Sequence, residues 1–418
     1  MKTLLVLAAG RLQLPAITIA KRLGLRVVAL DGDARAPGLP LADVARVVDL
    51  LDVEACLAVA RELKPDGVIH ICSEVAMPAL GAINEELGLH GPGRSAVVRS
   101  TNKEQMRRAF EAGGAPSPRS FGAATETEAL AAARDLGGAI ILKPSRNSGS
   151  RGVTRIGDAN DSEAVKRAFQ RALAESRDRG VVVEEFVSGP EYSVEIVAWA
   201  GEPQVLALTD KETTGAPHFV ETGHSQPARV DADSRRVIEQ AAIAGVKALG
   251  IDWSAAHAEV RLSSRGPMLI EIGARLGGDF ITTELVPRST GIDMVEAAIQ
   301  LALGEVPHLR PQHPPQGAAI RYLSPKPGRV LAIEGVEPAR NVPGVGVVEV
   351  DVGVGGVVPE ITSSLARVGH VIAEGVDAAA AIAAAETARD LVCMVTVAAA
   401  TAGAGETQTC CVSPPSAQ

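Results

Sequence analysis

One stretch in the middle of the chain predicts a specific local structure: residues 258–278 read AEVRLSSRGPMLIEIGARLGG. Two apolar runs in it are separated by five residues of the kinds that form turns, which predicts a β-hairpin. A symmetric register across this hairpin pairs Leu262 with Met268 and, further from the turn, Glu259 with Glu271. The sequence therefore predicts two glutamates that face each other across adjacent strands.

The two opposed glutamates need an explanation, because directly opposed side chains have Cβ atoms only about 4.5–5.5 Å apart and like charges repel there. A cation between the carboxylates of Glu259 and Glu271 would remove this repulsion. Mg²⁺ suits the position, since it takes oxygen ligands and is usually held by one or two carboxylates together with substrate phosphates. The alternative interpretation is a pair of solvated glutamates on an edge hairpin, and the hairpin alone leaves both open.

Composition limits the class of protein and its partners. With about 150 residues per domain, a chain of 418 residues is expected to contain two to four domains. The net charge of −9 and the lack of a lysine or arginine cluster argue against a nucleic-acid partner. No run of about 18 apolar residues occurs, so no membrane span is expected. The short apolar run before Gly10 predicts a buried first strand rather than a signal peptide.

The cysteines are scattered and lack metal-ligand spacing, which fits free thiols in a reducing cytoplasm. They are Cys56, Cys72, Cys393, Cys410 and Cys411. No function is assigned to the adjacent pair at the end of the chain, and a cytoplasmic location is the expectation.

Residues 1–95 alternate short apolar runs with helical patterns, which is typical of a parallel, doubly wound α/β sheet. Strands are expected at residues 3–7, 26–30, 44–49 and 67–70, and helices at residues 15–23 and 53–63. The carboxyl edge of such a sheet can bind a nucleotide. Here, however, Gly10 stands alone where a dinucleotide fingerprint needs three glycines, so this signal is weak.

The rest of the chain falls into further segments. Helices are expected at residues 102–112, 126–136, 161–175, 232–250 and 293–303, and strands at residues 139–142, 181–187, 191–199 and 204–209. Residues 211–228 combine glycine, proline and charges, so we expect a loop there. Residues 316–400 predict short strands and one alanine-rich helix at residues 378–390, and the tail from residue 401 is predicted to be disordered.

Two upstream motifs could bind a nucleotide. Lys143 ends a buried strand and opens a loop rich in glycine and serine, whose backbone N–H groups can cradle phosphate oxygens. It is not a Walker loop, because the lysine precedes the glycines, and a flexible surface loop is the alternative. Glu184-Glu185-Phe186-Val187 ends another apolar strand, where a carboxylate and backbone groups can read an adenine. A strand end with solvated acids is the alternative there.

Taken in order along the chain, these motifs resemble the ATP-grasp superfamily of carboxylate–amine ligases. The order is Lys103, Lys143 with its loop, Glu184 to Val187, Glu191, Glu259, Glu271 and Arg275. The resemblance implies an α/β chain with an ATP-grasp fold, an N-terminal Rossmann-like parallel sheet domain and a C-terminal α+β part. The implied division is a pre-ATP-grasp domain at residues 1–95, a nucleotide lid at 100–190, a catalytic subdomain at 191–310, a C-terminal extension at 311–400 and a tail at 401–418.

The same resemblance implies roles for individual residues, with ATP and one or two Mg²⁺ ions as cofactors and Mn²⁺ as a substitute. Glu259 and Glu271 would hold the metal. The implied ATP contacts are Lys103, Lys143, Ser148, Gly149, Ser150, Glu184, Glu185, Phe186, Val187 and Glu191. One departure is Gly273, because many members carry an asparagine there as a further metal ligand. The second metal would then have one ligand fewer or use water.

The family chemistry joins a carboxylate to an amine. A carboxylate attacks the γ-phosphate to give an acyl phosphate and ADP, and an amine then displaces phosphate. Catalysis of such a reaction depends mainly on positioning the reactants and neutralising the phosphate charge. Lys143 would supply part of the positive charge. Arg275 could hold the reacting carboxylate or stabilise the tetrahedral intermediate, and a structural salt bridge to Glu271 or Glu259 is the alternative. Gly277 and Gly278 would let a substrate approach the backbone closely.

Within the superfamily, the stretch FVETGHSQPA at residues 219–228 is similar to the L-amino acid ligases that make dipeptides. By this similarity Glu221 would bind the ammonium group of the acyl donor, and His224 would lie beside the substrates or else stabilise the loop by a hydrogen bond. The partners would be small amino-acid or carboxylic-acid and amine substrates, and a homodimer would be compatible with the family. His257 could face the same side as Glu259, but packing is its simpler interpretation.

Three alternatives remain open for the function. Two are enzymes of the same superfamily, either similar to biotin carboxylase or acting in purine synthesis. The third is a non-catalytic ATP-binding protein.

Overall fold

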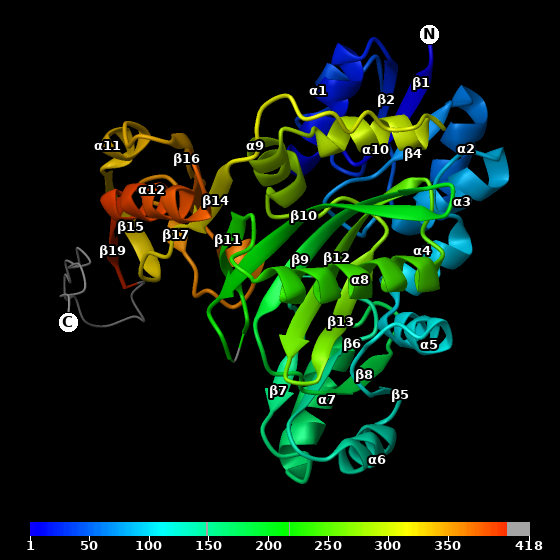
Figure 1. Cartoon of the computed structure of the whole chain (residues 1–418), viewed down its shortest axis with the longest axis vertical. Coiled ribbons are helices and arrows are strands. Elements are labelled where there is room, and N and C mark those ends of the chain that lie inside the picture. Colours follow the sequence, from blue (N-terminus) through cyan, green and yellow to red (C-terminus); the bar gives the residue numbers. More distant parts are fainter. Residues whose placement is uncertain (148, 217, 399–418) are drawn as a thin grey trace. The chain divides into compact units, whose positions relative to one another are not determined.

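The computed structural model describes residues 1–147, 149–216 and 218–398 (Figure 1). The chain forms two compact units. The first contains Met1–Thr209 and Val230–Pro314, and the second contains Asp210–Arg229 and the residues from Pro315 onward. A short internal segment therefore leaves the first unit and joins the C-terminal part of the chain.

The N-terminal sheet is parallel, as predicted, with the strand order β3-β2-β1-β4. Its strands are β1 (Thr3–Leu7), β2 (Arg26–Asp31), β3 (Val44–Val47) and β4 (Gly67–Ile69). Helices α1 (Leu14–Arg22), α2 (Val53–Leu63) and α3 (Met77–Leu87) connect or follow these strands (Figure 1). The strand order reverses between β1 and β4, so the segment that follows β4 leaves the sheet at its switch point, where ligands of such sheets usually bind.

A second, antiparallel sheet has the order β5-β8-β6-β7. Its strands are β5 (Ser120–Ala123), β6 (Ile140–Pro144), β7 (Thr154–Ile156) and β8 (Val181–Glu185). Helices α6 (Glu126–Leu136) and α7 (Ser162–Glu175) pack on it through small and apolar side chains that include Phe169. Before this sheet, α4 (Arg94–Thr101) and α5 (Lys103–Gly113) lead in from the N-terminal domain.

The remaining strands of the first unit include the two strands of the predicted hairpin. In the order β13, β12, β9 and β10, they are β13 (Gly266–Gly273), β12 (Ser254–Ser263), β9 (Glu191–Trp199) and the first part of β10 (Glu202–Thr213). Helix α8 (Ala232–Leu249) packs against β12 and β13. After β13 the chain forms a π-helical turn (Ile281–Leu285), α9 (Val286–Thr290) and α10 (Met294–Ala302), and the buried side chains of α10 join the core of the N-terminal sheet.

The hairpin register confirms one predicted pair and corrects the other. Glu259 lies opposite Glu271, as predicted, but Leu262 lies opposite Pro267 rather than Met268. The turn is tighter than expected, because Ser263 already pairs with Gly266. A β-bulge beside Glu259 restores the glutamate pairing by placing an extra residue in β13.

The bulge has a packing cause. In an unbroken strand, residues three apart point to opposite faces. Leu269 and Ile272 are both fully buried, and both reach the backbone of Gly245 in α8, where an added Cβ would lie 2.7 Å from Leu269 Cδ1 and 2.5 Å from Ile272 Cδ1. The extra residue lets both side chains face the helix while Glu271 stays opposite Glu259.

The second unit contains two sheets. The larger one includes β11 (Glu221–Gln226), β14 (Gly317–Tyr322), β18 (Gly369–Gly375) and β16 (Val345–Val350) in that order, and β11 also pairs with the last residues of β10. Residues 211–228 were expected to form a loop, which is wrong for half of them, because β10 and β11 occupy residues 211–213 and 221–226. Their polar composition hid the strands, since His224, Ser225 and Gln226 are buried although polar.

The smaller sheet of the second unit has the order β17-β15-β19. Its strands are β15 (Gly328–Glu334), β17 (Val357–Val358) and β19 (Cys393–Val397). Helices α11 (Val336–Arg340) and α12 (Ala378–Leu391) complete an alanine- and valine-rich core. The predicted tail at 401–418, with Cys410 and Cys411, lies outside the described residues. Among the described helices, none is both long and apolar enough to cross a membrane.

Candidate active site

The first part of the site is a buried charge cluster on the second sheet. Lys143 lies on β6 and Glu184 on the neighbouring strand β8, and Lys143 Nζ is 2.7 Å from Glu184 Oε2. On the other side, Arg107 Nε of α5 is 2.9 Å from Glu184 Oε1. All three side chains are buried. One carboxylate is thus held between two cations.

The protonation of this cluster follows from burial and charge. Burial lowers the pKa of the Lys143 ammonium, and the positive charges of Arg107 and Lys103 lower it further, against the opposing effect of Glu184. Burial alone would raise the pKa of Glu184, but Arg107 and Lys143 outweigh it and hold that pKa below its usual range. The surplus of positive charge makes this a suitable place for phosphate oxygens.

Lys103 connects this cluster to the hairpin. It is the first residue of α5, which begins after Asn102, and the Asn102 side chain accepts a hydrogen bond from the Gln105 backbone N–H. Lys103 Nζ donates to the carbonyl oxygen of Asn147 at 2.8 Å and lies 3.2 Å from the Glu271 carboxylate. Burial would lower the pKa of Lys103, but Glu271 and Glu74 outweigh it and raise that pKa.

The two hairpin glutamates remain accessible, with 25% of the Glu259 side chain and 22% of the Glu271 side chain exposed. Within the described residues, no group of three or more His, Cys, Asp or Glu side chains is placed to hold a metal ion. Two oxygen-donor carboxylates fit Mg²⁺ or Mn²⁺ only if substrate phosphates and water complete the coordination. The donor set therefore fits a metal that arrives with a nucleotide.

Arg275 follows the hairpin and meets a residue that was not predicted. Its Nη2 lies 3.4 Å from Glu74 Oε1, and its Nη1 donates to the carbonyl oxygen of Leu276 at 3.1 Å. Burial and the charge of Glu271 raise the pKa of Glu74. Glu74 comes from the segment after β4, at the switch point of the N-terminal sheet, and its position after a parallel strand is the only signal that could have found it.

The same guanidinium explains the glycine at position 273. A Cβ added to Gly273 would lie 3.2 Å from Cζ and 3.3 Å from Nε of Arg275. The Arg275 side chain therefore leaves little room for a side chain at residue 273. The salt bridge from Arg275 to Glu271 or Glu259 that was considered as an alternative is not among its contacts, and Glu74 is the carboxylate beside it.

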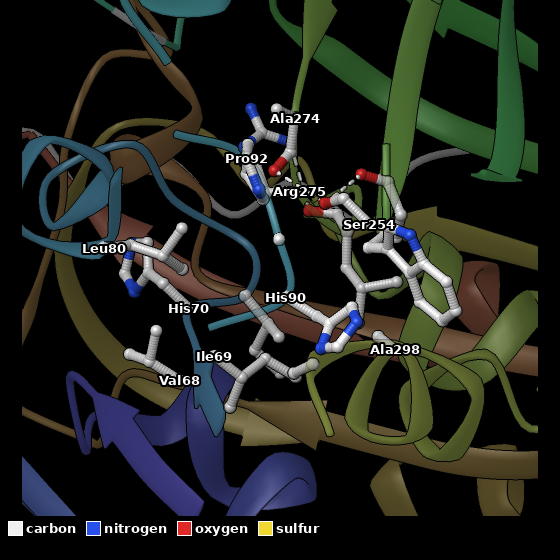
Figure 2. A pocket seen from close by; sticks show the side chains of 16 residues that line it. Val68, Ile69, His70, Leu80, His90, Pro92, Ser254, Ala274, Arg275 and Ala298 are labelled. Atoms are coloured by element: carbon white, nitrogen blue, oxygen red, sulfur yellow. Dashed lines mark hydrogen bonds between the residues drawn. The ribbon is translucent and has the colours of Figure 1, made fainter. Parts of the chain in front are cut away.

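Figure 2 shows Arg275 beside a pocket of the first unit, together with His70, His90 and Ser254. His70 and Ser254 in this pocket already have hydrogen-bond partners. Burial lowers the pKa of His70 to about 4, so its ring is neutral. Its Nδ1 donates to the carbonyl oxygen of Leu7 at 2.7 Å, and Ser254 Oγ donates to the carbonyl oxygen of Ala255 at 2.9 Å. We therefore place the chemistry on the hairpin side of Arg275 rather than in this pocket.

The predicted adenine segment lies next to the hairpin. Glu185 accepts from Arg265 Nη2 at 2.8 Å, and Glu191 accepts from Arg261 Nε at 2.8 Å. Arg261 also donates to the carbonyl oxygen of Val187 at 2.9 Å. The Phe186 ring lies under the Arg155 guanidinium, with 4.3 Å from its Cζ to the ring centroid.

The other predicted ATP contacts are Glu184 and the residues of the phosphate loop. The Glu184 carboxylate is held in the buried cluster, so adenine would have to meet the backbone of this segment or replace one of its cations. In the phosphate loop, Gly149 and Ser150 both have left-handed backbones, with φ of 69° and 57°. Ser148 lies outside the described residues.

Glu221 and His224 belong to the second unit, on β11. Glu221 Oε2 accepts a hydrogen bond from Ser364 Oγ at 2.8 Å, and its Oε1 lies 3.5 Å from Lys211 Nζ. The His224 ring is buried and lies edge-on to Tyr322, with 6.5 Å between the ring centroids. The unit thus holds a carboxylate with two polar partners at the start of a strand whose last four residues are buried.

A buried arginine supports this strand. Arg321 Nη1 donates to the carbonyl oxygen of His224 at 3.3 Å, and its Nη2 lies 2.8 Å from Glu212. A Cβ added to Gly223 would lie 2.8 Å from Arg321 Nη1, so the strand can approach the guanidinium only with glycine at this position. Arg321 was not singled out in the sequence, because its role depends on contacts between strands far apart in the chain.

Comparison with known protein families agrees with this geometry. Residues 136–284 match the ATP-grasp domain, and residues 321–397 match the L-amino acid ligase C-terminal domain 2. The structure is similar to the crystal structure of an L-amino acid ligase from Bacillus licheniformis, with a TM-score of 0.81 and 26% sequence identity over 95% of this chain and 99% of that chain.

Curated relatives include two enzymes and one uncharacterized protein. Alanine–anticapsin ligase of Bacillus subtilis is 28% identical over 68% of this chain and 67% of its own length. A formate-dependent phosphoribosylglycinamide formyltransferase of Prochlorococcus marinus is 29% identical over 64% of this chain and 69% of its own length. The uncharacterized protein y4rH of Sinorhizobium fredii is 28% identical over 70% of this chain, and the match spans only 61% of that relative.

The comparisons therefore identify an ATP-grasp domain at residues 136–284 and an L-amino acid ligase C-terminal domain at residues 321–397. The predicted fold class, with its parallel N-terminal sheet and ATP-grasp fold, is confirmed.

Proposed function

We propose that this protein is an ADP-forming ligase that activates the carboxylate of an amino acid with ATP and joins it to an amine, a second amino acid in the first instance. One observation carries the proposal: Lys103 Nζ lies 3.2 Å from the Glu271 carboxylate, which brings a phosphate-binding cation to the proposed metal seat. Lys143 extends this positive charge through the second sheet.

Glu259 and Glu271 would hold Mg²⁺, with Mn²⁺ as a substitute, and the phosphates of ATP would complete its coordination. When bound, the ion would neutralise charge on the phosphates. Lys103 and Lys143 would contact phosphate oxygens, Gly149 and Ser150 would close the loop over them, and the segment from Glu184 to Val187 with Glu191 would hold the nucleoside. These assignments rest on the contacts of each side chain and on the family.

The chemistry then needs a carboxylate in line with the γ-phosphate. The carboxylate oxygen would form a bond to phosphorus as ADP leaves, and an amine would attack the carbonyl carbon of the acyl phosphate as phosphate leaves with that oxygen. The Arg275 guanidinium is mostly buried beside Glu74, and a planar cation in such a place can bind the carboxylate and the developing oxyanion. Gly277 and Gly278 follow it and would face the substrate.

The second unit would supply recognition of the donor. Glu221 would bind the ammonium group of the amino acid by a charge-assisted hydrogen bond, with Ser364 orienting its carboxylate. Lys211 contacts Glu221 now, so a bound ammonium would share or replace this partner. His224 would lie beside the substrates. The L-amino acid ligase domain that includes Ser364 supports this assignment.

The test is a pairwise matrix of amino acids and amines, assayed for ADP formation with mass detection of the product. The proposal expects ADP only when a carboxylate donor is present, and an amide or dipeptide mass with particular pairs. ADP formation without any amide product from any pair would contradict it. Tight ATP binding with no ADP from any pair would favour the non-catalytic alternative.

A second candidate function is formate-dependent formylation of an amine, favoured by the similarity to the Prochlorococcus enzyme. The C-terminal L-amino acid ligase domain favours the amino-acid donor instead. Formate in place of the amino acid in the same assay separates the two functions. A cytoplasmic location is part of the proposal and rests on the free thiols of Cys56 and Cys72. A homodimer would be tested by light scattering.

A further inference from the structure

A buried carboxylate, a histidine and one of the hairpin glutamates form a line across two adjacent strands. Glu195 on β9 lies directly opposite His257 on β12, and Glu195 Oε1 is 2.6 Å from His257 Nδ1. On the other side of the ring, His257 Nε2 is 3.9 Å from Glu259 Oε1. The Glu195 side chain is fully buried, whereas Glu259 is partly exposed.

The donor and acceptor roles in this line are fixed by chemistry. An ionised carboxylate only accepts hydrogen bonds, so His257 Nδ1 carries the hydrogen that Glu195 receives. The other carboxylate oxygen, Glu195 Oε2, is buried and has no hydrogen-bond partner in the described part of the chain. Glu195 therefore depends on His257, and this contact fixes the plane of the ring with its Nε2 edge toward Glu259.

Gly277 closes this arrangement from the loop that follows Arg275. A Cβ added to Gly277 would lie 2.6 Å from His257 Nδ1 and 3.0 Å from Glu195 Oε2. The neighbouring Gly278 differs, because its added Cβ would meet only the carbonyl oxygen of Cys72, at 3.4 Å. Neither glycine has a positive φ, so backbone strain is not the reason for either. Gly277 is required by the histidine–carboxylate pair.

We propose that His257 is a positioning residue, clamped by Glu195 and Gly277, that orients the Glu259 carboxylate toward the bound divalent ion. The inference rests on the proposed metal role of Glu259. His257 and Glu259 are two residues apart on β12 and so share one face of the sheet, which lets the ring act on the carboxylate without touching the metal. Groups that orient metal ligands in this way typically change metal affinity by about 10- to 100-fold when they are removed.

The experiment measures Mn²⁺ affinity with the full chain. Mn²⁺ is titrated into the protein with ADP present, and the free ion is followed by its electron paramagnetic resonance signal. The variants are His257→Ala, Glu195→Gln and Gly277→Ala. Each is expected to weaken Mn²⁺ binding about tenfold. Gly277→Ala is the most specific of these variants, because it keeps every polar group of the site and displaces only His257 and Glu195.

Two matched variants control for packing. Gly157→Ala adds the same methyl group outside the proposed metal and substrate sites, where no atom lies within 4 Å of the added Cβ, and is expected to leave Mn²⁺ affinity unchanged. His370→Ala removes another buried histidine with a glutamate neighbour, Glu349 at 3.4 Å, in the second unit. It is expected to lower the thermal unfolding midpoint without changing Mn²⁺ affinity. A purely structural His257 would behave like His370.

Glu259→Gln separates failure of this inference from failure of the proposed function. If Glu259→Gln binds Mn²⁺ as tightly as the unaltered protein, the metal seat itself is wrong. If Glu259→Gln weakens Mn²⁺ binding while Gly277→Ala and His257→Ala do not, Glu259 is a metal ligand but His257 does not position it. Melting curves of all variants identify any that unfold, and Gly277→Ala and Glu195→Gln then decide the question in place of His257→Ala.

Discussion

The two units hold their charges in different ways. In the first unit, Lys103, Lys143 and Arg107 surround the Glu184 and Glu271 carboxylates, and the participating elements come from distant parts of the chain. In the second unit, Glu221 has two polar partners, Ser364 and Lys211, on a strand supported by Arg321. The first arrangement concentrates positive charge, whereas the second presents one carboxylate.

This difference separates two tasks. A surplus of buried cations suits a polyanion such as a nucleoside triphosphate. Such an arrangement would serve an ATP-dependent ligase regardless of the acid that the enzyme activates. A single carboxylate suits an ammonium group, and it would act only on a donor that carries one. If the first unit carries the ATP chemistry and the second selects the donor, as we propose, variants in each unit should have separable effects.

The largest effect is expected at the charge cluster. Lys143→Ala and Glu271→Gln should each lower the rate of ADP formation about a thousand-fold, because the first removes a cation beside the phosphates and the second removes a ligand of the proposed metal. Circular dichroism should show an intact fold. Lys166→Ala, in an exposed pair with Glu163, is the control and should keep its rate. Near-normal turnover in either cluster variant would refute the phosphate and metal assignments.

Arg107→Met tests whether the cluster also stabilises the first unit. Arg107 contacts the buried Glu184 and donates to the carbonyl oxygen of Ile270 at 2.7 Å, so its removal leaves a buried charge with one partner fewer. The free energy of unfolding should fall by about 3–5 kcal/mol in chemical denaturation. Arg119→Met, which breaks an exposed pair with Asp135, should change it little. Equal stability of the two variants would show that the cluster is not tightly packed.

A more selective effect is expected at Glu221. Glu221→Ala should raise the KM for the amino-acid donor about 10- to 100-fold, the range for a lost hydrogen bond to a charged group, and leave the KM for ATP unchanged. Initial rates with each substrate varied in turn measure both constants. Glu360→Ala, at an exposed position, is the control for the loss of a glutamate and should leave both constants unchanged. An unchanged donor KM would remove Glu221 from the substrate site.

The smallest effect is expected at Ser364. Ser364→Ala removes one hydrogen bond to the Glu221 carboxylate, worth about 1 kcal/mol, so the donor KM should rise roughly fivefold. The neighbouring Ser363 makes no capping hydrogen bond at the short helix Ser364–Ala366. Ser363→Ala should therefore leave the donor KM unchanged. A larger effect at Ser363 than at Ser364 would contradict the orientation proposed for Glu221.

Much of the first unit could be predicted because its signals are local. The parallel sheet follows from the alternation of strands and helices, and the opposed pair of Glu259 and Glu271 follows from turn residues between apolar runs. The symmetric register was wrong nearer the turn, because the bulge that corrects it depends on how Leu269 and Ile272 pack on α8. No local pattern contains that information.

The parts that could not be predicted depend on contacts between distant segments. Arg107 and Glu74 are single charged residues on otherwise ordinary elements, and only the fold shows that they face Glu184 and Arg275. His257 was interpreted as packing, but the fold places it between two carboxylates. Burial alone would lower its pKa, and Glu195 outweighs this effect and raises the pKa to about 9. The roles of the predicted site residues and the predicted domain boundaries stay predictions.

Heavy-oxygen labelling of the donor carboxylate tests the acyl-phosphate step. The donor amino acid is labelled with heavy oxygen in its carboxylate, and the phosphate released during amide formation is analysed by mass spectrometry. The account predicts that each phosphate carries one labelled oxygen, because the carboxylate oxygen that attacked the γ-phosphate leaves with it. Unlabelled phosphate with amide product present would contradict the acyl-phosphate mechanism and, with it, the roles proposed for Lys143, Glu271 and Arg275.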